Sequence, residues 1–131
     1  MADEVILIIE DDLHIGGLVA QVLREAGHRP ELVRDVHAAR AAAERGLRPA
    51  AVLSDLMVSG SAGPAQLAAQ LAQLFPSSPI ALMTGVPPNR RAALGVTHTR
   101  VIEKPFELET LLEAVGAMIE RRPSVDDDRS Q

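Results

Sequence analysis

The sequence predicts an α/β domain with a parallel β-sheet covered by helices on both faces. Short β-branched or apolar runs alternate with segments of helical periodicity along the 131 residues. The run at residues 5–9 is continuously apolar, which is typical of a strand buried on both faces. The strand–helix order occurs five times, and such alternation favours parallel strands joined by right-handed crossovers. Together these observations predict a doubly wound α/β fold.

Five runs are predicted as strands because they are short and rich in apolar residues. The second run is the weakest, since charged residues flank its apolar pair Leu32-Val33. The predicted strands are residues 5–9, 31–34, 50–53, 79–83 and 99–102.

The segments between and after these runs carry apolar residues at helical spacing. Gly27 and Gly46 stand where C-terminal caps are expected, and Pro64 favours the first turn of a helix. Pro87 and Pro88 shorten the fourth helix. The predicted helices are residues 15–23, 36–45, 64–74, 89–94 and 107–120.

Length and composition limit the class of protein. One domain over residues 1–120 is expected, with 121–131 as a flexible tail or linker that contains Pro123 and three consecutive aspartates. The net charge of −5 disfavours direct nucleic-acid binding. The lack of cysteine excludes disulfides and thiolate metal sites, and the lack of a long apolar run excludes a membrane span. A cytoplasmic location without a membrane partner is therefore expected.

Polar side chains follow the predicted strands at the edge where ligands bind in open α/β sheets. Glu10 and Asp11 follow the first strand, Asp55 the third, Thr84 the fourth and Lys104 the fifth. Clustered carboxylates repel one another unless a cation neutralises them, and Mg²⁺ prefers such oxygen ligands. A lone carboxylate beside a lysine and a hydroxyl suits phosphoryl transfer onto an aspartate.

The chain resembles the receiver domain of two-component response regulators, of the kind found in chemotaxis regulators. Four motifs carry the resemblance, in chain order and each at the end of a predicted strand. They are VILIIEDD at residues 5–12, VLSDLM at 52–57, IALMTG at 80–85 and EKPF at 103–106. The resemblance implies a flavodoxin-like (βα)5 fold with strand order 2-1-3-4-5.

The resemblance also implies a metal site for Mg²⁺. Asp55 matches the phosphoacceptor, which is also a metal ligand. Asp11 matches a direct Mg²⁺ ligand, and Glu10 matches a residue that acts through water. Met57 matches the position whose backbone carbonyl completes the protein ligands.

A second group of positions matches the phosphoryl-binding and switch residues of the family. Lys104 and Thr84 match the residues that bind the phosphoryl group, and Pro105 matches a proline that often follows a cis peptide bond. Gly85 stands where alanine is common, and Val101 stands where an aromatic residue usually reports phosphorylation. The switch region is therefore expected at Thr84, Gly85, Val101 and Pro105.

The resemblance implies a phosphoacceptor rather than a turnover enzyme. A histidine kinase or phosphotransfer protein would phosphorylate Asp55, and a protein-interaction face would switch. Val101 and the short fourth helix leave an alternative open, a pseudo-receiver that binds partners independently of phosphorylation. An aspartyl-phosphate hydrolase is disfavoured because the chain has no length for a substrate-covering cap.

Some charged residues have simpler explanations. Asp12 is expected to cap the first helix or to be solvated, rather than to bind metal. Arg90, Arg91 and Arg100 could form a basic patch for an acidic partner, but a solvated surface is the expected role.

Overall fold

A computed structural model describes residues 4–96 and 100–121. Five parallel strands form one sheet, as the strand–helix alternation predicted, and their order β2-β1-β3-β4-β5 is the one that the resemblance implied. The reversal of strand order at β1 and β3 makes the doubly wound arrangement. The strands are β1 (Val5–Ile9), β2 (Arg29–Val33), β3 (Ala51–Asp55), β4 (Ile80–Thr84) and β5 (Arg100–Glu103).

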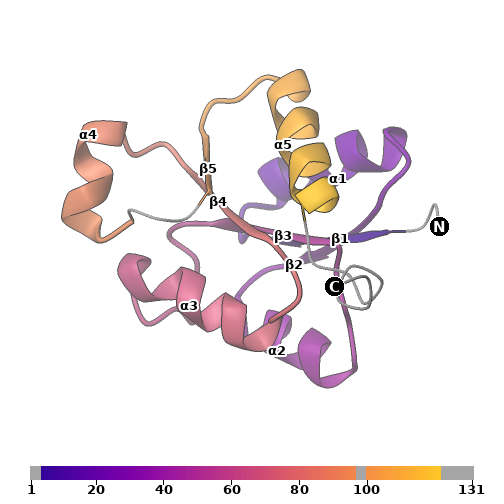
Figure 1. The fold of residues 1–131 in the computed structure, drawn as a ribbon, viewed down its shortest axis with the longest axis horizontal. Coiled ribbons are helices and arrows are strands. Elements are labelled where there is room, and N and C mark those ends of the chain that lie inside the picture. The colour runs from indigo at the N-terminus through magenta and orange to yellow at the C-terminus, as the bar shows by residue number, and fades with distance from the viewer. Residues whose placement is uncertain (1–3, 97–99, 122–131) are drawn as a thin grey trace, which may run out of the picture.

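The helices cover the two faces of the sheet (Figure 1). The core beneath α1 and α5 is separate from the core beneath α2 and α3. Between β4 and β5, a single turn of α-helix continues into one turn of 3-10 helix, η1. The helices are α1 (Leu13–Glu25), α2 (Val36–Glu44), α3 (Pro64–Leu74), α4 (Pro88–Arg91), η1 (Ala92–Leu94) and α5 (Leu108–Arg121).

Local sequence explains where the first two helices begin. The Asp12 carboxylate accepts hydrogen bonds from the backbone amides of His14 (2.9 Å) and Ile15 (3.2 Å). Asp35 accepts one from the amide of Ala38 (2.8 Å). Each aspartate satisfies amides that a helix start leaves free. The expected capping role of Asp12 is therefore confirmed.

Several boundaries differ from the predicted ones. β2 begins at Arg29 rather than at Glu31, so it includes Pro30, which the sequence interpretation had left out. A proline is tolerated there because β2 is an edge strand. β3 and β4 continue to Asp55 and Thr84 because their backbones stay paired to the end, although polar side chains had suggested earlier ends. Arg121 ends α5, and the rest of the tail predicted over 121–131 lies outside the described residues.

Candidate functional site

Three carboxylates meet at the carboxyl edge of the sheet. Glu10 and Asp11 directly follow β1, and Asp55 ends the neighbouring strand β3. One oxygen from each of the three lies within 4.8 Å of the others. This arrangement follows from topology, because the ends of adjacent parallel strands lie side by side. Asp12, which caps α1, is not part of this group.

Lys104 lies between two of these carboxylates. Its Nζ is 3.3 Å from Oε1 of Glu10 and 3.4 Å from Oδ1 of Asp55. The Lys104 side chain is 22% exposed and that of Asp55 is 18% exposed, whereas Glu10 is only 1% exposed. Asp55 therefore both contacts Lys104 and is accessible to an incoming group, whereas Glu10 contacts Lys104 but is buried.

The burial of Glu10 changes its acidity. Burial raises the pKa of the Glu10 carboxyl above its ordinary value, and the nearby charge of Asp55 adds to the rise. The backbone amide of Asp12 donates to Oε2 of Glu10 (3.2 Å), and this bond and Lys104 act in the opposite direction. The charged form of Glu10 therefore depends on nearby positive charge, which Lys104 supplies.

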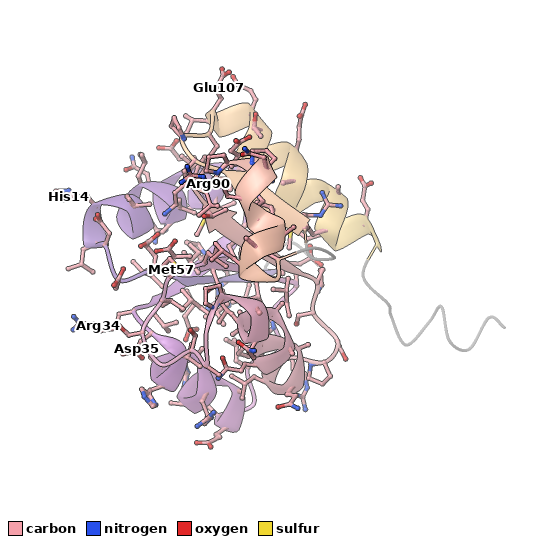
Figure 2. All side chains as sticks on the ribbon, turned by 90° about the vertical axis from the view of Figure 1, so that its left-hand side faces the viewer. His14, Arg34, Asp35, Met57, Arg90 and Glu107 are labelled. Carbon is pink, nitrogen blue, oxygen red and sulfur yellow. The ribbon has the colours of Figure 1, made fainter. Side chains whose placement is uncertain are left out.

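The donor set fits a hard divalent cation. Carboxylate oxygens from Glu10, Asp11 and Asp55 are the ligand type that Mg²⁺ prefers, and Mg²⁺ usually keeps several waters. Met57 lies two residues after Asp55, on the face formed by this sheet edge, and its side chain is exposed (Figure 2). Figure 2 shows Met57 below His14 and Arg90 and above Arg34 and Asp35 in that view.

The residues predicted to form the switch region lie on or next to β4 and β5. Thr84 is buried at the end of β4, and its hydroxyl oxygen accepts a hydrogen bond from the amide of Val86 (3.0 Å). The Thr84 carbonyl accepts one from the amide of Lys104 (2.8 Å). The Lys104–Pro105 peptide bond is cis. Val101 is partly buried and packs against the core under α2 and α3.

Arg91 is not simply solvated, and for this residue the sequence interpretation is wrong. Its side chain is 18% exposed, its Nε donates to the Val86 carbonyl (3.2 Å), and its Nη2 lies 3.7 Å from Oε2 of Glu103. Arg90 and Arg100 are exposed, as expected. The sequence had no signal for these contacts, because they depend on how the chain turns after Pro88.

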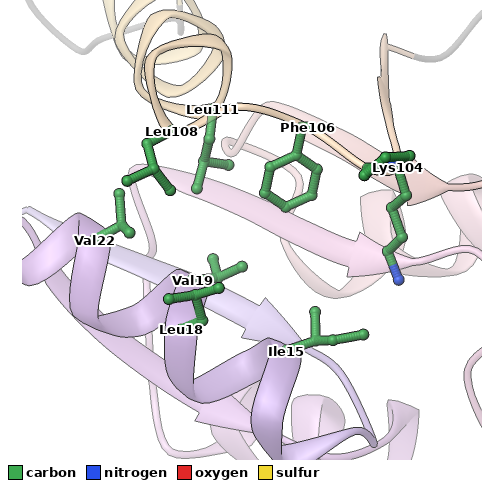
Figure 3. A pocket seen from close by; sticks show the side chains of 9 residues that line it. Ile15, Leu18, Val19, Val22, Lys104, Phe106, Leu108 and Leu111 are labelled. Carbon is green, nitrogen blue, oxygen red and sulfur yellow. The ribbon is translucent and has the colours of Figure 1, made fainter.

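An apolar groove lies beside the site, between α1 and α5. It has a volume of about 360 Å³, and side chains of the two helices face each other across it (Figure 3). Lys104 lies at one end, to one side of the apolar side chains. The groove includes Leu18 and Leu108, which are exposed. Apolar surface is thus available next to the acidic cluster.

Comparisons with known proteins agree on the family. A family model described as the response regulator receiver domain matches residues 6–116. A response regulator receiver protein from Sinorhizobium medicae is similar in structure, with a TM-score of 0.77 and 23% identity over 92% of this chain and 98% of that chain. A comparison with curated protein sequences finds no significant match.

Two further solved structures illustrate the range of similar proteins. The receiver domain of a sensor histidine kinase from Pseudomonas aeruginosa, solved with magnesium in its active-site cleft, has a TM-score of 0.77 and 24% identity over 91% of this chain and 99% of that chain. The chemotaxis response regulator CheY4 of Vibrio cholerae has a TM-score of 0.72 and 25% identity over 88% of this chain and 98% of that chain.

Proposed function

Since this chain belongs to the response regulator receiver domain family, we propose that it is a phosphoacceptor switch phosphorylated on Asp55 with the help of Mg²⁺. The observation that carries the proposal is the position of Lys104. Its ammonium is within 3.4 Å of the Asp55 carboxylate, at an edge that gathers three carboxylates. Members of this family act as signalling modules that interact with histidine kinases or phosphotransfer proteins.

In the proposed reaction, a carboxylate oxygen of Asp55 attacks phosphorus in line with the bond to the donor. That bond breaks as the new oxygen–phosphorus bond forms, and the donor's imidazole nitrogen or acyl oxygen leaves with the electron pair. Lys104 donates to a phosphoryl oxygen as its contact with Asp55 is replaced. Thr84 offers a hydroxyl that can donate to the same group.

The metal role of the remaining residues is part of this proposal. Asp11 and Asp55 would hold Mg²⁺ directly, Glu10 would act through water, and the Met57 carbonyl would complete the protein ligands. Bound Mg²⁺ would neutralise charge on the carboxylates and on the transferred group. The magnesium in the similar domain from Pseudomonas aeruginosa supports this assignment.

A protein donor fits the surroundings of Asp55. The groove beside Lys104 presents apolar side chains of α1 and α5, and exposed apolar surface next to a polar site is typical of protein contacts. The donor class proposed is therefore a histidine kinase or phosphotransfer protein. The cytoplasmic location and the lack of nucleic-acid binding stay predictions from the sequence.

Intact mass spectrometry after incubation with acetyl phosphate tests the proposal. One phosphoryl adduct is expected with Mg²⁺ and none in EDTA. The Asp55→Asn variant, which keeps the size of the side chain, is expected to give no adduct. Equal labelling of wild type and Asp55→Asn would overturn the assignment.

A pseudo-receiver is the second candidate, and the observation that favours it is Val101. An aliphatic side chain packed against the core cannot swing as an aromatic ring does. Binding of beryllofluoride with Mg²⁺ separates the two functions, because it mimics the phosphoryl group without needing transfer. Saturable binding supports the switch, whereas no binding supports the pseudo-receiver.

A further inference from the structure

Arg91 connects three segments around the buried hydroxyl of Thr84. Its Nε donates to the carbonyl of Val86, and the amide of the same Val86 donates to Oγ1 of Thr84. Both backbone groups of Val86 are thus held, one by α4 and one by the end of β4. The position of Val86 depends on Arg91 and on Thr84 at the same time.

The same arginine reaches β5. Its Nη2 lies 3.7 Å from Oε2 of Glu103, which pairs with Thr84 in the sheet and immediately precedes Lys104. This ion pair is loose, because the distance is long and the Glu103 side chain is 57% exposed, so it contributes little by itself. Nη2 is also buried and makes no hydrogen bond within the described residues. The firm contact of Arg91 is therefore the one to Val86.

Resting on the phosphoacceptor role above, we propose that Arg91 is a positioning residue that holds Val86, and through it Thr84, in the resting arrangement. When the Thr84 hydroxyl moves toward a phosphoryl group on Asp55, its oxygen leaves the Val86 amide. The loop from Gly85 to Pro87 can follow only if the Arg91–Val86 contact is released. Arg91 thereby links the phosphoryl site to α4 without an aromatic residue at position 101.

The proposal fixes the sign of a substitution effect. A contact made only in the resting arrangement opposes binding of any ligand that requires the other arrangement. Removing the Arg91–Val86 contact lowers the free energy needed to leave the resting arrangement. Arg91→Met, which keeps an unbranched apolar stem but no donor, is therefore expected to bind beryllofluoride with Mg²⁺ about fivefold more tightly than wild type.

The matched control is Arg90→Met, one residue earlier on α4, where the side chain is exposed. Dissociation constants for beryllofluoride at saturating Mg²⁺, measured by titration calorimetry, are expected to be equal for Arg90→Met and wild type. Glu103→Gln, which removes only the loose ion pair, is expected to have a smaller effect than Arg91→Met. A general loss of structure would weaken binding, so tighter binding by Arg91→Met alone supports the positioning role.

The outcomes separate this proposal from the proposed function. If wild type fails to bind beryllofluoride, the phosphoacceptor function is overturned and the coupling with it. If wild type binds but Arg91→Met binds equally or more weakly, only the positioning role is overturned. Hydrogen exchange of the Val86 amide in wild type, followed by NMR, needs no substitution. Faster exchange on beryllofluoride binding supports the release of this amide, and unchanged exchange contradicts it.

Discussion

Glu10 is a buried carboxyl group whose charged form lowers the stability of the fold. Its carboxylate is buried beside two further carboxylates, and its pKa is raised. In the folded state it therefore holds its proton to higher pH than in the unfolded chain. At a pH below the pKa of Glu10 in the unfolded chain, the carboxyl is protonated in both states, so the difference does not change the free energy of unfolding. As pH rises toward and through the folded pKa, Glu10 progressively destabilises the fold.

Glu10→Gln is expected to stabilise the protein in EDTA at neutral pH by about 1 kcal/mol, because it removes a buried charge from a functional cluster. At a pH below the unfolded pKa of glutamate the gain is expected to vanish. Urea unfolding followed by far-UV circular dichroism measures both values. The exposed Glu113→Gln is the control, with no change expected at either pH. An equal gain for Glu10→Gln at both pH values would show that its charge is not the cause.

Gly85 lies beside the site but does not need to be glycine. Its φ is not positive, and an added Cβ would meet only the carbonyl oxygen of Lys104, at 4.0 Å. Gly85→Ala is expected to stabilise the protein by about 0.5 kcal/mol, since alanine restricts the unfolded chain.

Gly95 is the opposite case and the control for Gly85. It has φ +80°, and an added Cβ would lie 2.5 Å from Cβ of Ala65. Gly95→Ala is expected to cost more than about 1 kcal/mol, because it forces a strained backbone and a clash. Urea unfolding of both variants measures the contrast, and similar values for the two would contradict it.

At the scale of single elements, α1 begins where the acidic cluster ends. Asp12 caps this helix, while its neighbour Asp11 belongs to the group of three carboxylates. Asp12→Ala is expected to lower the free energy of unfolding by about 1 kcal/mol, because two amides lose their acceptor. Asp12→Ser, which keeps a capping oxygen, is expected to recover most of it.

Mg²⁺ titration of the Asp12 variants separates capping from metal binding. Asp12→Ser is expected to bind Mg²⁺ as wild type does, whereas Asp11→Asn is expected to bind it at least tenfold more weakly. A large loss of affinity in Asp12→Ser would place Asp12 among the ligands.

The elements were predictable from the sequence where apolar pattern and caps agree. β1 and α3 have the predicted bounds, since a continuous apolar run and a first-turn proline mark them. The apolar pattern predicted strand ends less well where backbone pairing continues beyond the apolar residues. β3 includes the polar residues Ser54 and Asp55, and β2 includes Pro30, because hydrogen bonding along the sheet and edge position decide these ends.

In the molecule as a whole, strand order brings the site together. Residues far apart in the sequence meet because the parallel strands all end at the same edge of the sheet. β1 and β3 are adjacent there, and only β4 separates β3 from β5. The alternation of strands and helices predicted that Glu10, Asp55 and Lys104 lie at one edge of the sheet, and the resemblance to receiver domains implied the strand order. The contacts of Arg91 were not, because they depend on the path of a short loop rather than on topology. Within residues 4–96 and 100–121, no helix combines the length and apolarity needed to cross a bilayer.

A ligand that binds only the folded site stabilises the whole molecule. Saturation with Mg²⁺ is expected to raise the midpoint of thermal unfolding, with a gain of about 2.7 kcal/mol at one hundred times the dissociation constant. Asp11→Asn, whose affinity is at least tenfold weaker, is expected to gain no more than about 1.4 kcal/mol at the same concentration. Circular dichroism melts with and without Mg²⁺ measure this, and an equal gain in both proteins would indicate binding elsewhere.

The central claim is that Asp55 carries the phosphoryl group. Reduction with borohydride converts a phosphorylated aspartate to homoserine, which peptide mass spectrometry can locate in the chain. After treatment with acetyl phosphate and Mg²⁺, we expect homoserine at position 55 and unmodified aspartate at positions 11 and 12. Homoserine at another aspartate, or at none although an adduct forms, would contradict this account.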